Sequence, residues 1–158
     1  MDGTIRPVRL VLQRVSEAEV TVEGEVVATI GPGLVVLVGV APTDQPIDAK
    51  AVAEKLAGIR LFADDGGHMN RSIVETGGEI LVVSQFTLLA DVQRGRRPSF
   101  TGAAPPEFAS PLIDALVGHL SESGIPTQAG RFGARMGVSL VNDGPVTLVL
   151  EFSEGRLV

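Results

Sequence analysis

The residues with the most unusual local chemistry are Asn142, Asp143, Gly144 and Pro145, at the centre of the stretch VSLVNDGPVTLVLE. Apolar runs rich in β-branched side chains flank them, and this pattern predicts a strand, a tight turn and a second strand. Glycine reaches backbone angles that other residues avoid, proline lacks an amide donor, and an X-Pro bond can be cis. The turn is therefore either an ordinary hairpin loop or a rigid pair of backbone acceptors.

An apolar run predicts a central strand over residues 80–88. Near its end lies a short segment with three polar side chains, Ser84, Gln85, Phe86 and Thr87. Alternation along a strand would place Ser84 and Phe86 on one face and the other two on the opposite face. Polar side chains in such a place need hydrogen-bond partners. They either tie down neighbouring loops or face a ligand, with Thr87 as a candidate nucleophile.

No general base is evident beside Thr87. The only histidines are His68, in a predicted turn, and His119, on a predicted helix, and we expect both to be solvated or structural. Asp143 is typical of a turn former. The chain has no cysteine and no histidine or carboxylate cluster with metal-ligand spacing, so the sequence predicts neither a metal nor another cofactor. Any chemistry must then come from positioning and from backbone groups.

Three stretches resemble the D-aminoacyl-tRNA deacylase family: GRFGARMGVSLVNDGPVT at 130–147, LVVSQFTLLADVQRGRRPSF at 81–100, and LQRVSEAEVTVEGE at 12–25 followed by GPGLVVLVGV. They follow the family's order from about residue 8 to the C-terminus, and two long motifs at the right separation are a specific signal. The resemblance implies hydrolysis of the ester bond of D-aminoacyl-tRNA, and of glycine mischarged on tRNA(Ala), releasing amino acid and tRNA.

The resemblance also implies how substrates are selected. The carbonyls of Gly144 and Pro145, in a cis turn, would hold a D-residue and leave no room for an L side chain. Arg14 matches a family arginine that orients this turn. In the family the turn reaches into the partner subunit's site, so a homodimer is implied.

The other site residues implied by the resemblance are Ser84, Gln85, Phe86 and Thr87 as pocket lining, with Phe132 and Met136 near the terminal adenosine. Backbone amides would stabilise the oxyanion, and the terminal ribose hydroxyl of the tRNA would assist the chemistry. Thr87 would then be a local hydrogen-bonding group rather than an obligatory nucleophile. Core packing is the alternative for Phe132 and Met136.

One dense basic cluster, Arg94, Arg96 and Arg97, lies in a long predicted loop at 91–106. It either meets acceptor-stem phosphates or is simply solvated. The net charge of −6 argues against coating nucleic acid through bulk electrostatics, but gripping one RNA end needs only a local basic patch.

Two positions depart from the family pattern, since Arg135 replaces an acid and Gly137 a glutamine. They leave open a non-catalytic module that binds an RNA end. A third possibility is a relative with a trans turn that acts on a small L-residue, and Arg14 argues against it.

The length of the chain predicts one domain over residues 1–158, with 1–7 as a flexible N-terminal extension. The composition, 44% hydrophobic and 20% charged, is typical of a globular protein with a core. The lack of cysteine and of a secretory signal leads us to expect a cytoplasmic protein. The uncharged stretch at 26–43 is broken by Gly31, Pro32 and Gly33, which favours a buried strand over a membrane span.

The periodicity predicts strands at 8–15 and 34–40, a hairpin across 19–28, and two main helices at 47–61 and 108–120. Asp44 is the expected cap of the first helix, and Pro111 is expected near the first turn of the second. These elements predict a single α+β domain with a mostly antiparallel or mixed, barrel-like sheet. The resemblance implies the fold of the D-aminoacyl-tRNA deacylases.

Overall fold

The computed structural model describes residues 7–42 and 44–158. The strands are β1 (Val8–Val22), β2 (Glu25–Ile30), β3 (Gly33–Gly39), β4 (Phe62–Ala63), β5 (Met69–Arg71), β6 (Glu79–Ser84), β7 (Thr127–Ala129), β8 (Gly137–Ser153) and β9 (Arg156–Leu157). The helices are α1 (Pro46–Gly58), α2 (Ile73–Thr76) and α3 (Pro106–Glu122), with a short 3-10 helix, η1 (Phe86–Leu89), after β6. Residues 1–6 of the expected 1–7 extension lie outside the described residues.

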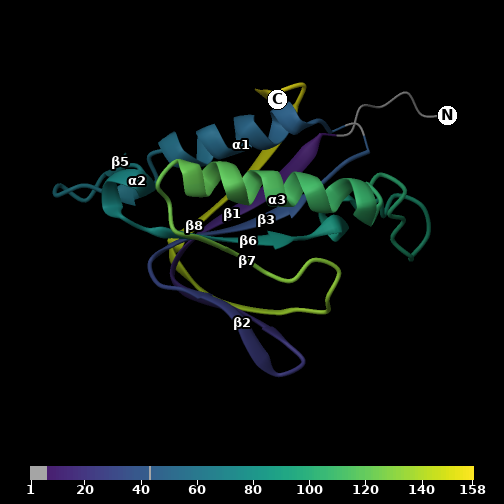
Figure 1. The fold of residues 1–158 in the computed structure, drawn as a ribbon, viewed down its shortest axis with the longest axis horizontal. Coiled ribbons are helices and arrows are strands. Elements are labelled where there is room, and N and C mark those ends of the chain that lie inside the picture. Colours follow the sequence, from purple (N-terminus) through teal and green to yellow (C-terminus); the bar gives the residue numbers. More distant parts are fainter. Residues whose placement is uncertain (1–6, 43) are drawn as a thin grey trace.

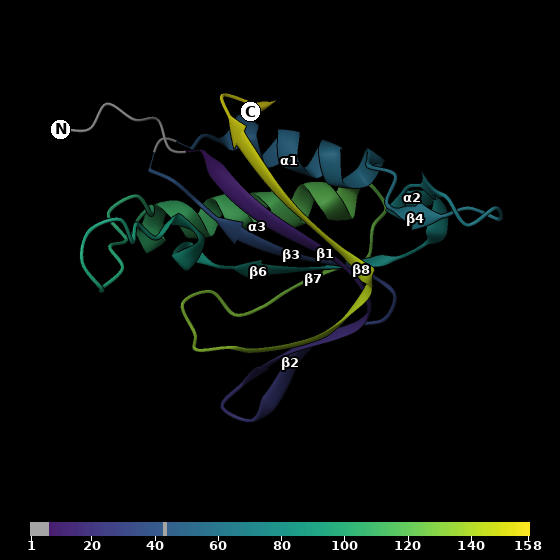
Figure 2. The same cartoon turned by 180° about the vertical axis from the view of Figure 1, so that it is seen from behind.

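One mixed, strongly curled sheet organises the domain, with strand order β7-β6-β3-β1-β8-β9 and β2 on β1. β1 is antiparallel to β2, β3 and β8, whereas β6 is parallel to both β3 and β7. α1 and α3 cover one face, and the β1–β2 hairpin curls away from the helices (Figures 1 and 2). The predicted α+β fold with a barrel-like mixed sheet and two main helices is confirmed.

Two apolar cores lie on the two sides of this sheet. Leu10 and Leu12 of β1 pack under the helices, whereas Val15, Ala18 and Val20 belong to the core inside the curled part. A regular strand alternates faces, so the irregularity between Val15 and Glu17 lets one strand serve both cores. β1 therefore runs through to Val22, well past the predicted end at residue 15.

Local turn chemistry agrees with the predicted hairpin, because Glu23 and Gly24 both have positive φ, at 52° and 80°.

The helix starts differ from the prediction. Gln45, not Asp44, is the N-cap of α1, and its N–H donates to Asp48. α3 begins at Pro106, so Pro111 lies inside the helix rather than in its first turn. In both helices a proline takes an opening position, where its missing N–H has no intrahelical acceptor to lose.

β8 is the largest departure from prediction, because its chain does not reverse at residues 142–145. Both arms of β8 pair with β1, and Thr147 lies opposite Gln13 while Asn142 lies opposite Val15. The four residues between them form a bulge facing Arg14, and the strand continues beyond it with a bend (Figure 2). The hairpin interpretation is wrong because one very long strand, β1, supplies the partner for both flanks.

Asp44 is buried, and its carboxylate accepts the Ala41 N–H at 2.6 Å. Burial, aided by the nearby charge of Asp48, raises the pKa of Asp44 to about 7. The folded state thus binds this proton more tightly than the unfolded state. The contribution of protonated Asp44 to the stability of the fold is therefore fully present below about pH 4 and is lost as the pH rises to about 7.

Asp44→Asn cannot ionise and should escape that loss. As the pH rises from 4 to 7, the unfolding free energy of the variant minus that of the wild type, measured with urea, should increase by about 2–4 kcal/mol. Asp114→Asn, at an exposed position of α3, is the control and should show no such trend. A difference between Asp44→Asn and wild type that does not change with pH would contradict this assignment.

None of the helices within the described residues has the length and apolar composition needed to cross a membrane.

Candidate active site

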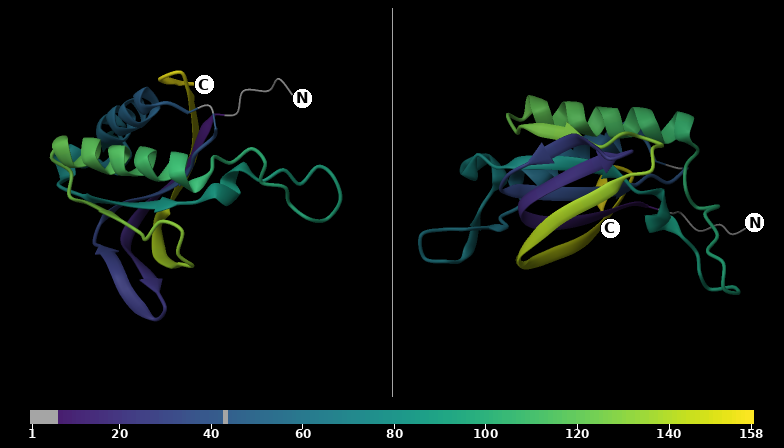
Figure 3. Two further views of the ribbon diagram at one scale, coloured as in Figure 1. Left: turned by 45° about the vertical axis from the view of Figure 1, so that its right-hand side comes forward. Right: turned by 90° about the horizontal axis from the view of Figure 1, so that it is seen from below.

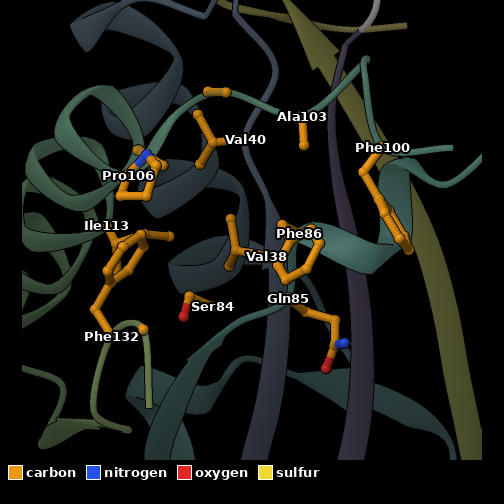
Figure 4. A pocket seen from close by; sticks show the side chains of 13 residues that line it. Val38, Val40, Ser84, Gln85, Phe86, Phe100, Ala103, Pro106, Ile113 and Phe132 are labelled. Atoms are coloured by element: carbon orange, nitrogen blue, oxygen red, sulfur yellow. The ribbon is translucent and has the colours of Figure 1, made fainter. Parts of the chain in front are cut away.

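A cavity of about 370 Å³ opens where β3 and β6 end, beneath η1 and the start of α3. Its lining is mostly apolar and includes Val38, Phe86, Ile113 and Phe132, with Ser84 and Gln85 as polar members. Figure 4 shows Phe132 beside Ile113 on one side of the cavity and Phe86 toward the other. Phe86 contacts Phe100 edge-on, with ring centroids 5.1 Å apart. Such a cavity suits a flat apolar group that carries a few polar atoms.

The chain leaves the sheet directly after Ser84 because it turns into η1. The Gln85 N–H donates to the carbonyl of Val38 at 2.7 Å, and the Leu88 N–H then closes the turn on the Gln85 carbonyl at 3.1 Å. Gly39 leaves room for this, since a Cβ there would lie 3.1 Å from the same carbonyl oxygen. The prediction of a strand over 80–88 is therefore wrong beyond residue 84. The predicted alternation of residues 84–87 between the two faces of a strand is wrong for the same reason.

Ser84, Gln85 and Phe86 line the cavity, whereas Thr87 is exposed and is not part of the lining. The hydroxyl of Thr87 accepts a hydrogen bond from the side-chain amide of Gln85, which is a local contact and not activation by a base. The N–H groups that open a 3-10 helix, here those of Phe86 and Thr87, have no carbonyl within the helix to bond. They are backbone donors beside the cavity.

The two histidines lie elsewhere in the fold. His68 is 3.8 Å from Asp64 in a surface turn, and His119 is 4.0 Å from Glu122 on α3. No three histidine, cysteine, aspartate or glutamate side chains gather as a metal site within residues 7–42 and 44–158.

Phe132 and Met136 lie on the same loop after β7 but contact different parts of the fold. Phe132 lines the cavity, whereas Met136 is partly buried against the core inside the curled sheet. Gly130 permits this packing, because a Cβ there would lie 2.6 Å from the sulfur of Met136. Met136 therefore packs as a core residue, while Arg135 is exposed on the same loop.

Arg14 holds the bulge in β8. Its Nε donates to the carbonyl of Asp143 at 3.2 Å and lies 3.5 Å from the carboxylate of that residue, while Nη1 donates to the carbonyl of Leu61 at 2.7 Å. The Gly144-Pro145 bond is cis, and Gly144 has a φ of 121°. The bulge thus presents Gly144 and Pro145 to solvent.

Asn142 has a structural role that the sequence analysis did not assign to it. Its side-chain amide donates to Thr147 Oγ1 at 2.8 Å and accepts the Val146 N–H at 3.3 Å, so it closes the base of the bulge. Asparagine commonly bonds nearby backbone in turns, and that tendency was the available signal. The partner across the bulge could not be inferred without the pairing of β8.

A single copy of the chain does not bring the bulge and the cavity together. In the sheet register Arg14 lies beside Leu34, which lies beside Ile80, whereas the cavity residue Ser84 lies beside Val38. The two rows are four residues apart, or about 13 Å along the strands. The bulge residues are absent from the cavity lining.

The basic cluster lies on a loop closed by a bridge between Asp91 and Ser99, whose backbone bonds are 2.7 and 2.8 Å long. Arg94, Arg96 and Arg97 are all exposed there. The loop projects away from the body of the domain (Figure 3). Its base lies just after η1, so the loop leaves the domain beside the cavity.

Comparison with known proteins decides the family. A family model described as D-Tyr-tRNA(Tyr) deacylase matches residues 11–151. The chain belongs to this family. D-aminoacyl-tRNA deacylase of Roseiflexus castenholzii is 59% identical over 143 residues, covering 90% of this chain and 91% of the relative. The enzyme of the same name from Thermomicrobium roseum is 54% identical over 148 residues, covering 94% and 96%.

Solved structures agree with the fold. One described as c-Myc DNA Unwinding Element Binding Protein superposes with a TM-score of 0.85 at 38% identity, covering 92% of this chain and 99% of its own. A probable eukaryotic D-amino acid tRNA deacylase superposes at 0.80 with 18% identity over the same shares, a likeness of fold alone. The deacylase described here is a hydrolase that acts on aminoacyl-tRNA.

Proposed function

We propose that this deacylase proofreads chirality with a site built from two copies of the chain, the cavity of one and the Gly144–Pro145 bulge of the other. The supporting observation is the separation of bulge and cavity within one subunit. The bulge lies on β8, which exposes large apolar side chains such as Val141, 49% exposed, and Val149, 62% exposed. An apolar, accessible strand of this kind is suited to a second copy.

Substrate selection follows from rigid backbone. The carbonyls of Gly144 and Pro145 accept hydrogen bonds from the amino group of a D-residue, and an L side chain would collide with them. Backbone cannot reject a residue that has no side chain. Glycine on tRNA(Ala) is therefore also a substrate under this proposal.

Hydrolysis needs little from side chains because the ester is already activated. Phe132 offers a face for the terminal adenine, and the backbone N–H groups of Phe86 and Thr87 stabilise the developing oxyanion. The oxygen of water adds to the carbonyl carbon, the bond from that carbon to the ribose oxygen breaks, and the ribose oxygen takes the proton that the attacking water gives up. The neighbouring ribose hydroxyl of the tRNA orients the attack, and Thr87 keeps Gln85 in place.

The test of this function is deacylation of D-tyrosyl-tRNA, L-tyrosyl-tRNA and glycyl-tRNA(Ala) by the purified protein. Loss of the D and glycyl esters with the L ester spared supports the proposal. Equal loss of the D and L esters would refute chiral selection. Tight binding of the tRNA end with no ester lost would instead identify the non-catalytic binding module.

The basic loop offers a prediction about tRNA affinity. Replacing Arg94, Arg96 and Arg97 by glutamate should raise KM for D-tyrosyl-tRNA about tenfold at low salt, with kcat little changed, because phosphate contacts are lost. The salt dependence of kcat/KM should also become shallower. A control triple of the exposed Lys50, Lys55 and Arg156 to glutamate makes the same charge change away from the cavity. Equal effects from both triples would show only a net-charge effect.

A further inference from the structure

Three residues lie side by side across the sheet directly beneath η1. Glu151 of β8 pairs with Arg9 of β1, and Arg9 pairs with Gly39 of β3. Directly paired residues project to the same face of a sheet. A Cβ at Gly39 would lie 3.1 Å from Leu88 Cβ. η1 therefore packs against this row at Gly39, which has no side chain to keep it away.

Arg9 links that row to η1. Its Nη1 donates to the carbonyl of Leu88 at 3.0 Å, and its Nε bonds Glu151 Oε1 at 2.8 Å. The two side chains are 38% and 33% exposed, so solvent only partly screens them. The Leu88 carbonyl belongs to the last turn of η1, where carbonyls lack partners within the helix. The guanidinium of Arg9, on β1, supplies the missing hydrogen-bond donor.

The two ends of η1 are attached differently. The start is tied to β3 by the Gln85 N–H, which donates to Val38. The end is tied to the sheet by Arg9, whose guanidinium also bonds Glu151. Between these ties lie Phe86 and the backbone donors beside the cavity. Displacing a catalytic group by about 1 Å can cost two orders of magnitude in rate.

We infer that Arg9, oriented by Glu151, is a positioning residue that holds η1 and its backbone donors at the geometry that deacylation needs. The inference rests on the proposed function, since it takes the cavity beside η1 as the deacylation site. Arg9 itself does not line the cavity. Its effect passes through the Leu88 carbonyl.

Arg9→Gln should lower kcat for D-tyrosyl-tRNA about tenfold with KM nearly unchanged, because η1 shifts while the tRNA-binding surfaces stay. Arg9→Lys should recover part of that loss, since an ammonium can still donate to one of the two acceptors. Glu151→Gln should cause a smaller loss, and the double variant should be no worse than Arg9→Gln. A double variant whose losses multiply would contradict the coupling.

Arg71→Gln is the matched control. Arg71 Nη2 donates to the carbonyl of Glu75 at 2.9 Å, so it also bonds the carbonyl of a short helix, but away from the cavity. Its kcat should stay at the wild-type value. An equal fall in kcat for both arginine variants would reduce Arg9 to a general structural residue and overturn the inference.

Hydrogen exchange gives a readout independent of activity. The amides of Leu88 and Ala90, which bond the carbonyls of Gln85 and Thr87, should exchange about tenfold faster in Arg9→Gln. Unchanged exchange, or faster exchange with unchanged kcat, would overturn the inference. A wild type inactive on every ester would refute the proposed function. Unchanged exchange in an otherwise active protein would refute only the role of Arg9.

Discussion

Replacing Gly144 by alanine should lower kcat/KM for D-tyrosyl-tRNA about a hundredfold or more. Gly144 has a φ of 121°, a region that L side chains rarely adopt. A Cβ there would also lie 2.8 Å from Arg14 Nη2 and 3.0 Å from Val146 Cγ2. The strained φ and the contact with the Arg14 guanidinium both disturb the bulge, and its carbonyls lose the positions from which they select the substrate.

Gly24→Ala is the matched control for backbone strain. Gly24 also has a positive φ, at 80°, but a Cβ there would have no atom within 4 Å, and it lies at the tip of the β1–β2 hairpin. Both variants should lose about 1 kcal/mol or more of stability, measured by urea unfolding. Only Gly144→Ala should lose activity. If Gly144→Ala deacylates as fast as Gly24→Ala, the bulge has no part in the reaction.

Replacing Gly33 by alanine should have the largest effect on stability, a loss of about 3 kcal/mol or more in the free energy of unfolding. A Cβ on Gly33 would lie 1.8 Å from the carbonyl oxygen of Glu79 and 2.8 Å from its N and C atoms. These atoms are backbone, so no side chain can move aside. The parallel pairing of β3 with β6, which positions Ser84, must then give way.

Gly31→Ala is a close comparison for that experiment. A Cβ on Gly31 would meet only the side-chain oxygen of Glu79, at an ordinary 3.6 Å. Chemical denaturation should show little change for Gly31→Ala and a large loss, or failure to fold, for Gly33→Ala. Similar midpoints for the two variants would contradict the close approach of the two strands.

The sequence predicted the features that depend on local pattern. Leu34 and Val36 lie in an apolar run, and the strand they form is buried on both faces as expected. Val52 and Leu56 have helical spacing and are buried on α1. Glu23 and Gly24 make the expected hairpin turn. Each of these depends on residues close together in the chain.

The features that sequence reasoning missed depend on distant pairing. Asn142 and Thr147 flank a bulge rather than a hairpin because both pair with β1, more than 120 residues earlier in the chain. Ser84 ends its strand because Val38 accepts the next N–H and Gly39 gives η1 room. The bonds from Arg9 to Glu151 and Leu88 likewise cross the sheet, so no local motif announces them.

The most direct test of the two-copy site is subunit complementation. Gly144→Ala damages the bulge, whereas Ala103→Trp would fill the cavity, which Ala103 lines (Figure 4). Each variant alone should be nearly inactive on D-tyrosyl-tRNA. Equal co-expression should give mixed dimers in which one of the two sites is intact, and total activity should recover to about a quarter of the wild-type value. If the mixture is no more active than the average of the two variants, the bulge and cavity act within one subunit and the proposed site is wrong.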